Sequence, residues 1–470
     1  MDKMTSWSIS DTMHDWISQE INPSHFQDLR HAKRLRKILR TLSHNPTASI
    51  PLASRSSSDA QSIYRFWSNP TVMPETILQG HIEGTVARAM GYQTVLSIQD
   101  TTDLDFTSHP HTEGLGYLNQ TQQQGIKVHN CFAVSESGDP LGVLHQHTWV
   151  REEPPVPKKA RSAPQRQRNQ PIEAKESYRW LTTLSAAEAQ VAQRAHLVQV
   201  ADREADIFEL FAHPRAANSD LLIRVKTNRR IQQEWGKLFT ALGQAPVLGE
   251  LSVEVHRTPE RPARMAQVQL RALQVTLEVP EHLARQRPHL QPITLNALWV
   301  EEIGIPSDGG KPIRWKLLTT LPLETYAQAC QYVRWYSYRW LIERFHFTLK
   351  SGCQLEALQL QHRDRLLKAL ATYSIVAWRL MAMTYLARLT PDVSCEVILQ
   401  PEEWRLLRRR FAPKSRVKKP PTLHQAMVWI AQLGGFLARK GDGEPGLKTL
   451  WRGYTALHQM LEGARLVGKT

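Results

Sequence analysis

The hydrophobic and polar positions of residues 336–350 follow a period that predicts an amphipathic helix. At about 100° per residue, Arg339, Glu343 and Lys350 lie within about 60° of Tyr336. The large apolar side chains lie on the opposite side: Leu341, Ile342, Phe345 and Leu349. Such a helix packs by one face and presents a carboxylate between two cations on the other. The pattern leaves open an ordinary surface helix with an Arg339–Glu343 salt bridge.

Three regions with different patterns follow one another along the chain. Residues 1–80 predict small helices, residues 81–390 alternate between strand and helix patterns, and residues 391–470 predict helices again. We therefore expect an N-terminal helical domain, a central α/β domain and a C-terminal helical domain with these boundaries. Within the last of them, the Pro- and Lys-rich residues 413–421 predict a linker before a final pair of helices.

The central region contains short β-rich runs separated by helix patterns and turns. The predicted core strands are 94–99, 128–135, 141–150, 196–201, 220–227 and 313–320. Helices are predicted over 173–190 and 203–211. Residues 228–312 add three further strands with Pro- and Arg-rich turns, which indicates a β-rich insertion. Residues 151–171 are basic and Pro-rich, which favours a flexible loop.

Composition narrows the class of partner. The net charge of +15 and the pI near 9.7 favour a polyanion. Nucleic acid is favoured over a membrane, because no apolar run is expected to reach transmembrane length. The N-terminus has no apolar signal region, and the four cysteines are scattered without paired metal spacing. These features indicate a reduced, cytoplasmic protein without a zinc site.

The N-terminal region contains a basic amphipathic segment over residues 21–43. Its cationic positions include Arg30 and Arg34, and its apolar positions form one packed side. A basic helix of this kind near a terminus is typical of an element that reads a DNA groove. A helix that is merely soluble is the alternative, and the high net charge favours DNA.

Two acidic residues follow predicted strands directly: Asp100 after 94–99 and Asp202 after 196–201. With Glu343 from the polar helix face, they form three carboxylates that could converge on a metal. Carboxylate oxygens suit Mg²⁺ or Mn²⁺. Asp100 could instead cap a turn before its two threonines, and Glu204 or Asp206 could be surface charges. We prefer Asp202 to these because it alone directly follows the strand.

Three ordered motifs carry a resemblance to a known family. They are Asp100-Thr-Thr, Asp202-Arg-Glu-Ala-Asp206 and Tyr336-(2)-Arg339-(3)-Glu343-(6)-Lys350. Together they resemble the acid triad and the Tyr-Arg-Glu-Lys signature of the insertion-sequence-four family of bacterial cut-and-paste transposases. The resemblance covers nearly the whole chain and includes Tyr64-Arg-Phe, Trp315-Lys-Leu-Leu-Thr, Leu433-Gly-Gly-Phe and Leu450-Trp451.

The resemblance implies an α/β fold with a ribonuclease-H-like catalytic core interrupted by the β-rich insertion. It implies an N-terminal domain that binds the transposon end and a C-terminal helical dimerisation region. Asp100, Asp202 and Glu343 become the catalytic ligands of two Mg²⁺ ions, for which Mn²⁺ can substitute. The implied activity is excision by double-strand cleavage through a DNA hairpin, followed by joining of the 3′ ends to target DNA. The implied working form is a homodimer on paired ends in the bacterial cytoplasm, associated with the nucleoid.

The resemblance also implies a set of DNA contacts. Tyr336, Arg339 and Lys350 become contacts to a phosphate near the cut. Trp315 becomes the aromatic that stacks on a base flipped from the hairpinned end, although a core strand residue is the alternative for Trp315. The remaining implied contacts are Arg224 and Lys226 near the DNA end and Arg30 and Arg34 in the end-binding helix. The family has a further lysine where this chain has Phe347.

The expected dimer interface lies in the C-terminal helices. We expect Trp429, Ile430, Leu433 and Phe436 to be its apolar anchors.

Two other functions fit part of the sequence. A non-catalytic regulator, such as a decayed transposase that only occupies end sequences, would need no acids, yet all three are present. A metal-dependent nuclease without strand transfer would use the acids but leaves the basic helix and Trp315 unexplained.

Overall fold

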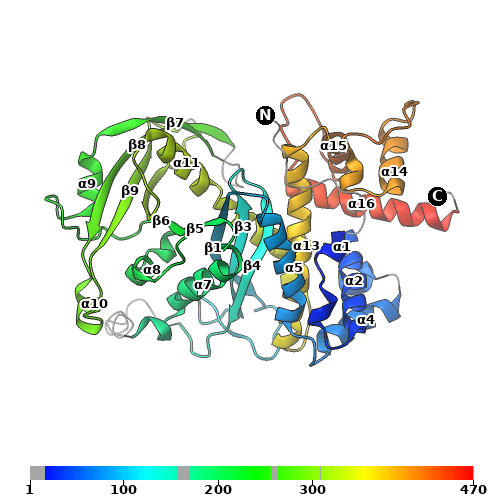
Figure 1. The fold of residues 1–470 in the computed structure, drawn as a ribbon. Helices are drawn as coiled ribbons and strands as arrows, with labels where there is room; N and C mark the ends of the chain where they lie inside the picture. The colour runs from blue at the N-terminus through cyan, green and yellow to red at the C-terminus, as the bar shows by residue number, and fades with distance from the viewer. Residues whose placement is uncertain (1–15, 55, 156–169, 256–262, 307, 469–470) are drawn as a thin grey trace.

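The computed structural model describes residues 16–54, 56–155, 170–255, 263–306 and 308–468 (Figure 1). Most of the predicted basic loop 151–171 lies outside the described residues. The N-terminal region is helical, as its pattern predicts. Its helices are α1 (Trp16–Gln19), α2 (Leu29–His44), α3 (Ile50–Ala53), α4 (Ser57–Ser68) and α5 (Pro74–Ala89).

Helix α2 is the predicted basic amphipathic helix. Asp28 caps its N-terminus, because its carboxylate accepts a hydrogen bond from the backbone N–H of Arg30. The apolar stripe is fully buried at Leu35, Leu39 and Leu42, whereas the cationic positions stay at the surface. The alternation of charged and apolar residues therefore fixes which side of α2 remains available to a partner.

Among the described residues, ten strands form one mixed sheet. The strands are β1 (Thr94–Asp105), β2 (Gly116–Tyr117), β3 (Gln124–Ser135), β4 (Pro140–Trp149), β5 (His196–Ala201), β6 (Ser219–Arg224), β7 (Val247–Val255), β8 (Arg264–Leu277), β9 (Ile293–Glu302) and β10 (Arg314–Thr319). Their order is β2-β3-β1-β5-β6-β10-β9-β8-β7, with β4 paired to β3. Strands β1, β5 and β6 are mutually parallel, while β3 and β10 flank them in antiparallel pairings.

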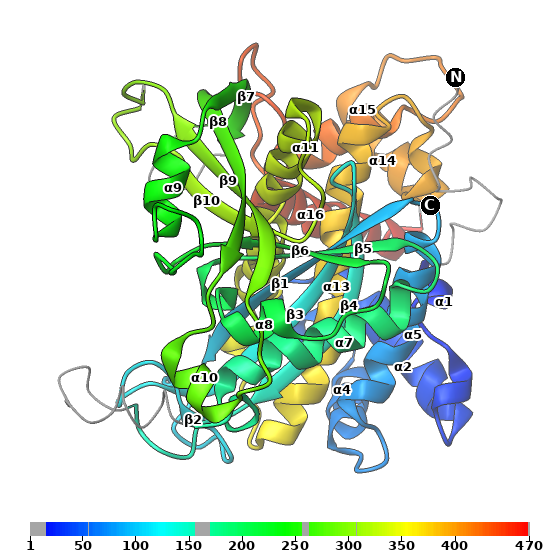
Figure 2. The same cartoon turned by 60° about the vertical axis from the view of Figure 1, so that its left-hand side comes forward.

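The predicted β-rich insertion is part of this sheet. Strand β9 pairs with β10, and β8 and β7 follow outward in antiparallel order (Figure 2). The insertion therefore extends the core sheet at one edge instead of forming a separate layer. Turn signals at residues 228–312 indicated the strands, but pairing between distant strands leaves no local mark in a sequence.

The remaining helices surround the sheet and build the C-terminal region. They are α7 (Arg179–Val191), α8 (Phe208–Ala212), α9 (Leu238–Gln244), α10 (Glu281–Gln286), α11 (Tyr326–Ser337), α12 (Trp340–Phe347), α13 (Arg363–Leu389), α14 (Pro401–Phe411), α15 (Leu423–Leu433) and α16 (Leu447–Leu466). The predicted helix 203–211 is present only as a short 3₁₀ turn, Arg203–Ala205, followed by α8.

Helix α13 connects the three regions. It packs against α2, α4 and α5 on the N-terminal side and against α15 and α16 on the C-terminal side (Figure 1). By length and composition α13 could cross a membrane, so the prediction that no apolar run reaches transmembrane length is wrong. However, 94% of its most apolar window is buried by the rest of the chain, as expected for the core helix of a soluble protein.

The single helix predicted over residues 336–350 is broken in the structure. Helix α11 ends at Ser337 and α12 begins at Trp340, and a π-helical turn follows at Thr348–Gly352. At the break, the N–H groups of Tyr338 and Arg339 bond to carbonyls three residues earlier, which tightens the turn. Tyr336 points inward and is 2% exposed, instead of lying on an open polar stripe.

The predicted dimer anchors are wrong in part. Trp429 and Ile430 are 8% and 1% exposed, because α15 packs them against its own chain. Leu433 and Phe436 are partly buried in the same core. An apolar helical pattern predicts burial but does not say whether the covering surface belongs to the same chain. The C-terminal region exposes other apolar side chains, namely Leu437, Leu466 and Val467.

A buried carboxylate lies between α14 and α16. Glu403 is 4% exposed, and its Oε1 lies 3.3 Å from His458 Nε2. Burial raises the pKa of the Glu403 carboxyl to about 7 and lowers the pKa of His458 to about 2, so His458 is neutral. The ionised form of Glu403 therefore opposes the packing of α14 on α16.

We expect Glu403→Gln to stabilise the protein above pH 7. The carboxyl titrates near 7 in the folded chain and near about 4.3 when unfolded. The folded state thus binds more protons between these values, and stability falls as pH rises through this window. The variant should remove this loss, which is about 3–4 kcal/mol above pH 7. Thermal unfolding of Glu403→Gln and of the exposed neighbour Glu402→Gln, at pH 5 and pH 8, tests this. Identical pH profiles for both variants and the parent would contradict it.

Candidate active site and nucleic-acid interface

Asp100 and Asp202 lie side by side on neighbouring parallel strands. Gln99 of β1 pairs in register with Ala201 of β5, so the next residue of each strand is acidic. Asp202 follows β5 directly, as predicted, and its carboxylate accepts a hydrogen bond from Glu204 N at 2.8 Å. Asp100 does not follow a strand, because β1 continues to Asp105. The polar run after Asp100 hid this continuation, which antiparallel pairing with β3 stabilises.

Arg339 joins two of the three predicted carboxylates. Its Nη2 donates to Glu343 Oε1 at 2.5 Å, and its Nη1 lies 4.0 Å from Asp100 Oδ2. The Arg339 side chain is only 18% exposed, whereas Glu343 is 56% exposed. The salt bridge that the helix pattern left open is therefore present, but it is not an isolated surface pair.

The charge state of Asp100 shows that the acids share one electrostatic environment. Burial is the largest influence and raises the pKa of the Asp100 carboxyl to about 7. Arg339 opposes this shift, whereas the negative charges of Asp202 and Glu343 add to it. A carboxyl whose pKa is raised to near neutrality by burial, with neighbouring acids adding to the shift, is typical of a functional site.

The donor set suits a hard divalent cation. Three carboxylates, two from strands and one from a helix, offer the oxygen ligands that Mg²⁺ and Mn²⁺ prefer. As the side chains stand, however, no group of three or more His, Cys, Asp or Glu residues in the described part of the chain is arranged to hold a metal ion. Arg339 gives the physical reason, because it engages Glu343 and approaches Asp100. The ligand chemistry fits, and the Arg339 contact is what a metal would displace.

Three predicted DNA contacts lie beside these acids. The rings of Trp315 on β10 and Tyr336 on α11 meet edge to face with centroids 5.1 Å apart. The Arg224 guanidinium lies close to the Tyr336 hydroxyl. Yet neither that hydroxyl nor Arg224 Nε has a well-formed hydrogen bond within the described residues. Buried donors without acceptors are costly, and a phosphate oxygen would satisfy them.

The other predicted contacts are more dispersed. Lys350 Nζ donates to the carbonyl of Asp103 at 2.7 Å and lies 3.1 Å from Glu356. It therefore approaches β1 beyond Asp100 and does not join the Arg339 contact. Lys226 follows β6 with an exposed side chain, and its backbone N–H donates to Asp206. The structure brings Arg224, Tyr336, Trp315 and Arg339 together with the acids but leaves these two lysines at the margin.

The N-terminal candidates lie on a separate hollow. Arg30 and Arg34 of α2, with Arg65 of α4, line a depression of about 280 Å³ between the two helices. Arg30 is 88% exposed and pairs with Asp28 at 2.8 Å. Arg65 belongs to the Tyr64-Arg-Phe motif but received no role from the sequence. Its place beside the two predicted arginines enlarges the cationic surface.

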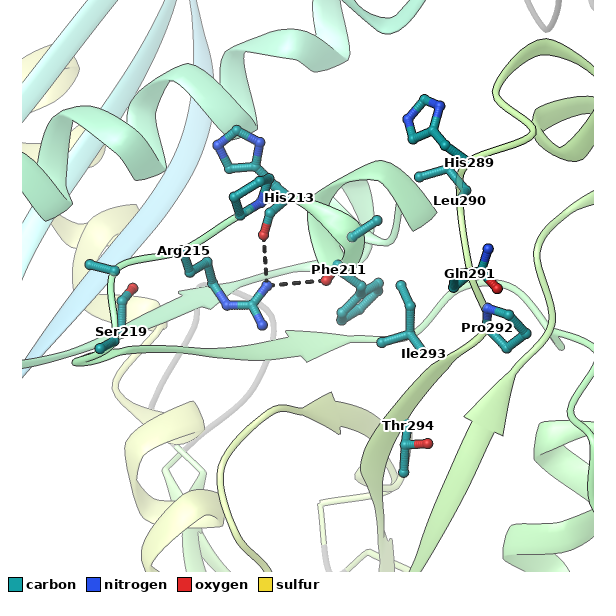
Figure 3. Close-up of a pocket in the computed structure, with 14 residues that line it drawn as sticks. Phe211, His213, Arg215, Ser219, His289, Leu290, Gln291, Pro292, Ile293 and Thr294 are labelled. Atoms are coloured by element: carbon teal, nitrogen blue, oxygen red, sulfur yellow. Dashed lines mark hydrogen bonds between the residues drawn. The ribbon is translucent and has the colours of Figure 1, made fainter.

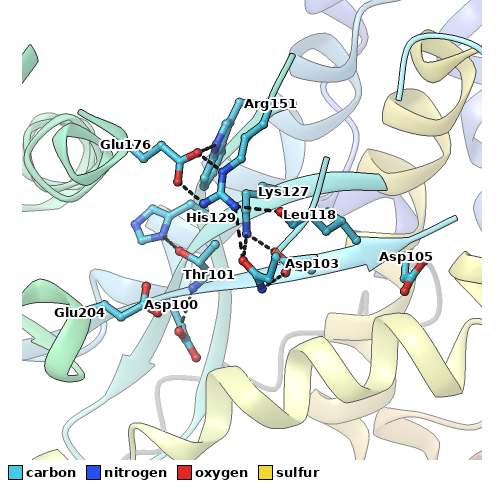
Figure 4. A network of polar contacts seen from close by, with 12 residues as sticks. Asp100, Thr101, Asp103, Asp105, Leu118, Lys127, His129, Arg151, Glu176 and Glu204 are labelled. Carbon is cyan, nitrogen blue, oxygen red and sulfur yellow. Dashed lines mark hydrogen bonds and ion pairs between the residues drawn. The ribbon is translucent and has the colours of Figure 1, made fainter. Parts of the chain in front are cut away.

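Sequence reasoning missed a polar chain on the opposite face of β1. Arg179 Nε donates to Thr101 Oγ1 at 3.0 Å. Thr101 Oγ1 lies 2.9 Å from His129 Nδ1 (Figure 4). His129 Nε2 in turn lies 3.1 Å from Gln99 Oε1, and Gln99 donates to Gln199. Burial lowers the pKa of His129, so its ring is neutral and carries one proton. Because Gln99 Oε1 can only accept, that proton is on Nε2, and Thr101 donates to Nδ1. The polar residues Gln99 and Thr101 on either side of Asp100 were the one sequence feature that could have indicated this network.

A second network of polar contacts joins the C-terminal half of β1 to the residues that flank the predicted basic loop. Lys127 pairs with Asp103 at 2.6 Å, and Arg151 pairs with Glu176 through two nitrogens (Figure 4). Arg151 also donates to the carbonyl of Leu118 at 3.0 Å. These contacts join the two sides of the loop base to the strand that holds Asp100.

The largest hollow among those described here lies elsewhere. It encloses about 730 Å³ beside α8 and the start of β9 (Figure 3). Arg215 at its wall donates to the carbonyls of Phe211 and His213. Ser219 lies at the start of β6, whereas Arg224 ends that strand near the acids. This hollow is therefore at the opposite end of the sheet from the candidate active site.

Comparison with known families gives the class of the protein. Residues 13–72 match the transposase DNA-binding model, and residues 179–379 match the transposase DDE domain model. Residues 375–469 match the transposase Tn5 dimerisation domain. The DDE match includes Asp202 and Glu343, while Asp100 precedes it.

The three matches, in this order, support a DDE-type DNA transposase. The matches correspond to an N-terminal DNA-binding domain, a central DDE domain in the mixed α/β region and a C-terminal dimerisation domain of the Tn5 type. DNA binding and homodimer formation are supported by the first and last of these domains.

Proposed function

We propose that this chain is a metal-dependent transposase of the insertion-sequence-four type, similar to the transposase of transposon five. It binds transposon ends, excises the element through a DNA hairpin and joins the 3′ ends to target DNA. The observation that carries the proposal is the position of Arg339, which contacts Glu343 and approaches Asp100 where Asp202 adds a third carboxylate.

Asp100, Asp202 and Glu343 are the proposed metal ligands. When bound, two Mg²⁺ ions supply an activated water or 3′-hydroxyl and stabilise the leaving oxygen at phosphorus. The strands β1 and β5 hold two ligands rigidly, whereas Glu343 on α12 is more exposed and can move. Repulsion among the three acids, evident in the pKa of Asp100, favours uptake of cations.

The cations beside the acids serve the DNA phosphate. Arg339 can exchange the Glu343 oxygen for a phosphate oxygen, which preserves its charge-assisted hydrogen bonds and frees the carboxylate. Tyr336 and Arg224 offer the buried donors that lack acceptors. Trp315 lies against Tyr336, where the accessible part of its ring can stack on an extruded base. Lys350 and Lys226 act as outer phosphate contacts.

Arg30 and Arg34 are the proposed contacts to the end sequence, on the exposed side of α2. A hairpin at each of two ends requires two active sites, which fits a homodimer on paired ends.

A cleavage assay on labelled end DNA tests the proposal. With Mg²⁺ we expect nicked, hairpinned and fully cut products in that order, and then joining to a target. A nuclease without strand transfer would cut but never join, and a regulator would bind ends without cutting. Random duplex of equal length serves as the control, and equal cutting of random and end DNA would refute the proposal.

Arg339→Ala should lower occupancy of the cut end and reduce the slope of log K against log salt by about 1. Arg339 lies next to the acids and is therefore expected to contact the phosphate at the cut. Loss of that one contact removes the release of about one counterion on binding. Fluorescence anisotropy at several salt concentrations measures both quantities. Arg334→Ala removes an exposed arginine of α11 and is the matched control. An unchanged slope for Arg339→Ala would remove it from the DNA contacts.

A further inference from the structure

The end of α14 and the segment after it form a dense cationic surface. Residues 404–422 contain eight arginines and lysines and no acidic residue. Seven of the eight are exposed: Arg405, Arg409, Arg410, Lys414, Arg416, Lys418 and Lys419. We call these seven residues the α14 basic surface. Neither the acid cluster nor the helix α2 accounts for it.

No carboxylate in the described part of the chain neutralises the charges of this surface. The acids of α14 lie in its first turn and are used elsewhere, because Glu402 pairs with Arg465 and Glu403 is buried. The negative end of the helix dipole stabilises the cations near the C-terminus of α14. The seven like charges nevertheless repel one another, and a polyanionic partner would relieve this repulsion.

The eighth cation, Arg408, gives the surface a defined shape. Its guanidinium lies 4.8 Å from the centre of the Trp404 ring. It also donates to the carbonyls of Val417 and Lys419. Arg408 thus holds the segment after α14 against the helix. The basic residues of the two stretches are brought onto one surface instead of being spread along a free linker.

The chemistry of this surface suits phosphates and not base edges. Between residues 404 and 421 the only neutral hydroxyl or amide side chain is Ser415, and its hydroxyl accepts from Val417 N at 3.3 Å. Sequence is normally read by such groups together with arginines held at defined angles. A surface of exposed cations without them binds duplex DNA irrespective of sequence.

We propose that the α14 basic surface binds the backbone of target DNA, as a site separate from the one that holds the transposon end. The inference rests on the proposed transposase function.

The position of α14 favours target DNA over end DNA. In both views α16 lies between α14 and the N-terminal helices, and α2 carries the end-binding candidates Arg30 and Arg34 (Figures 1 and 2). A duplex on α14 is therefore distinct from a duplex on α2. A surface that binds through charge alone can also accept DNA of any sequence, as target DNA requires. Because the surface belongs to the dimerisation domain, a dimer presents two copies of it.

The test uses full-length protein assembled on pre-cut end DNA without metal, so that α2 is occupied and no chemistry is needed. Labelled random duplex is then titrated into the complex at several salt concentrations. The triple variant Arg409→Gln, Arg410→Gln, Lys418→Gln should lower its affinity about tenfold at ~0.15 M salt and reduce the salt slope by about 2–3. Assembly on the ends and end cleavage with Mg²⁺ should remain parental.

The control triple variant is Arg194→Gln, Arg285→Gln, Lys311→Gln, which removes the same charge from three exposed positions elsewhere. Parental capture by the α14 variant, or an equal loss in the control, would overturn the inference. Loss of dimerisation or of end assembly would also overturn it, because the surface would then belong to another interface. If the parent forms no complex on paired ends, the proposed function fails instead.

Discussion

Replacing Asp100, Asp202 or Glu343 by alanine should abolish Mg²⁺-dependent cleavage while leaving end binding intact. Each change removes one proposed ligand of the metal ions and none of the proposed DNA contacts on α2. Metal ions contribute several kcal/mol to such reactions, which corresponds to a loss of about 10³-fold or more. The measurement is the rate of first-strand nicking on end DNA, with end binding followed by anisotropy on the same preparations.

Two controls separate chemistry from folding. Asp100→Asn keeps the acceptor for Thr101 N but loses the charge, so it should be as inactive as the alanine variant. Glu234→Ala removes an exposed carboxylate outside the site and should nick at the parental rate. Near-parental nicking by any one of the three acid variants would exclude that residue from the site.

The core elements of the candidate site could be predicted because their signals are local. The apolar run before Asp202 marks β5, and the strand does end where the sequence places it. The spacing of Arg339 and Glu343 by four residues requires only one turn of helix, and α12 provides it. Predictions that depend on one turn or one short strand survive because few distant residues influence them.

Other features depended on contacts that a sequence does not display. Strand β1 continues past Asp100 because β3 pairs with it as far as Asp105. Tyr336 precedes the break between α11 and α12 and is buried, although an ideal helix over residues 336–350 would place it on an open polar stripe. The contact between Arg339 and Asp100 arises only when a helix and a strand 239 residues apart are packed together.

Trp315→Ala should permit the first nick but slow hairpin formation or opening about tenfold, since stacking on a base contributes about 1–3 kcal/mol. The nick requires only the acids and a bound end, whereas the hairpin requires a base to leave the helix stack. Trp315 meets Tyr336 edge to face and is only half-buried, so part of its ring remains accessible to a base. A gel assay that separates nicked, hairpinned and fully cut DNA resolves these steps.

The alternative for Trp315 is a purely structural strand residue, and the conservative variant distinguishes the two roles. Trp315→Phe retains an aromatic face, so it should restore much of the hairpin step while leaving a smaller side chain against Tyr336. A structural role predicts the reverse, with a lowered melting temperature and equal slowing of the nick and the hairpin. If Trp315→Ala forms hairpins and cut ends at the parental rate, the stacking role is wrong and Trp315 belongs to the core.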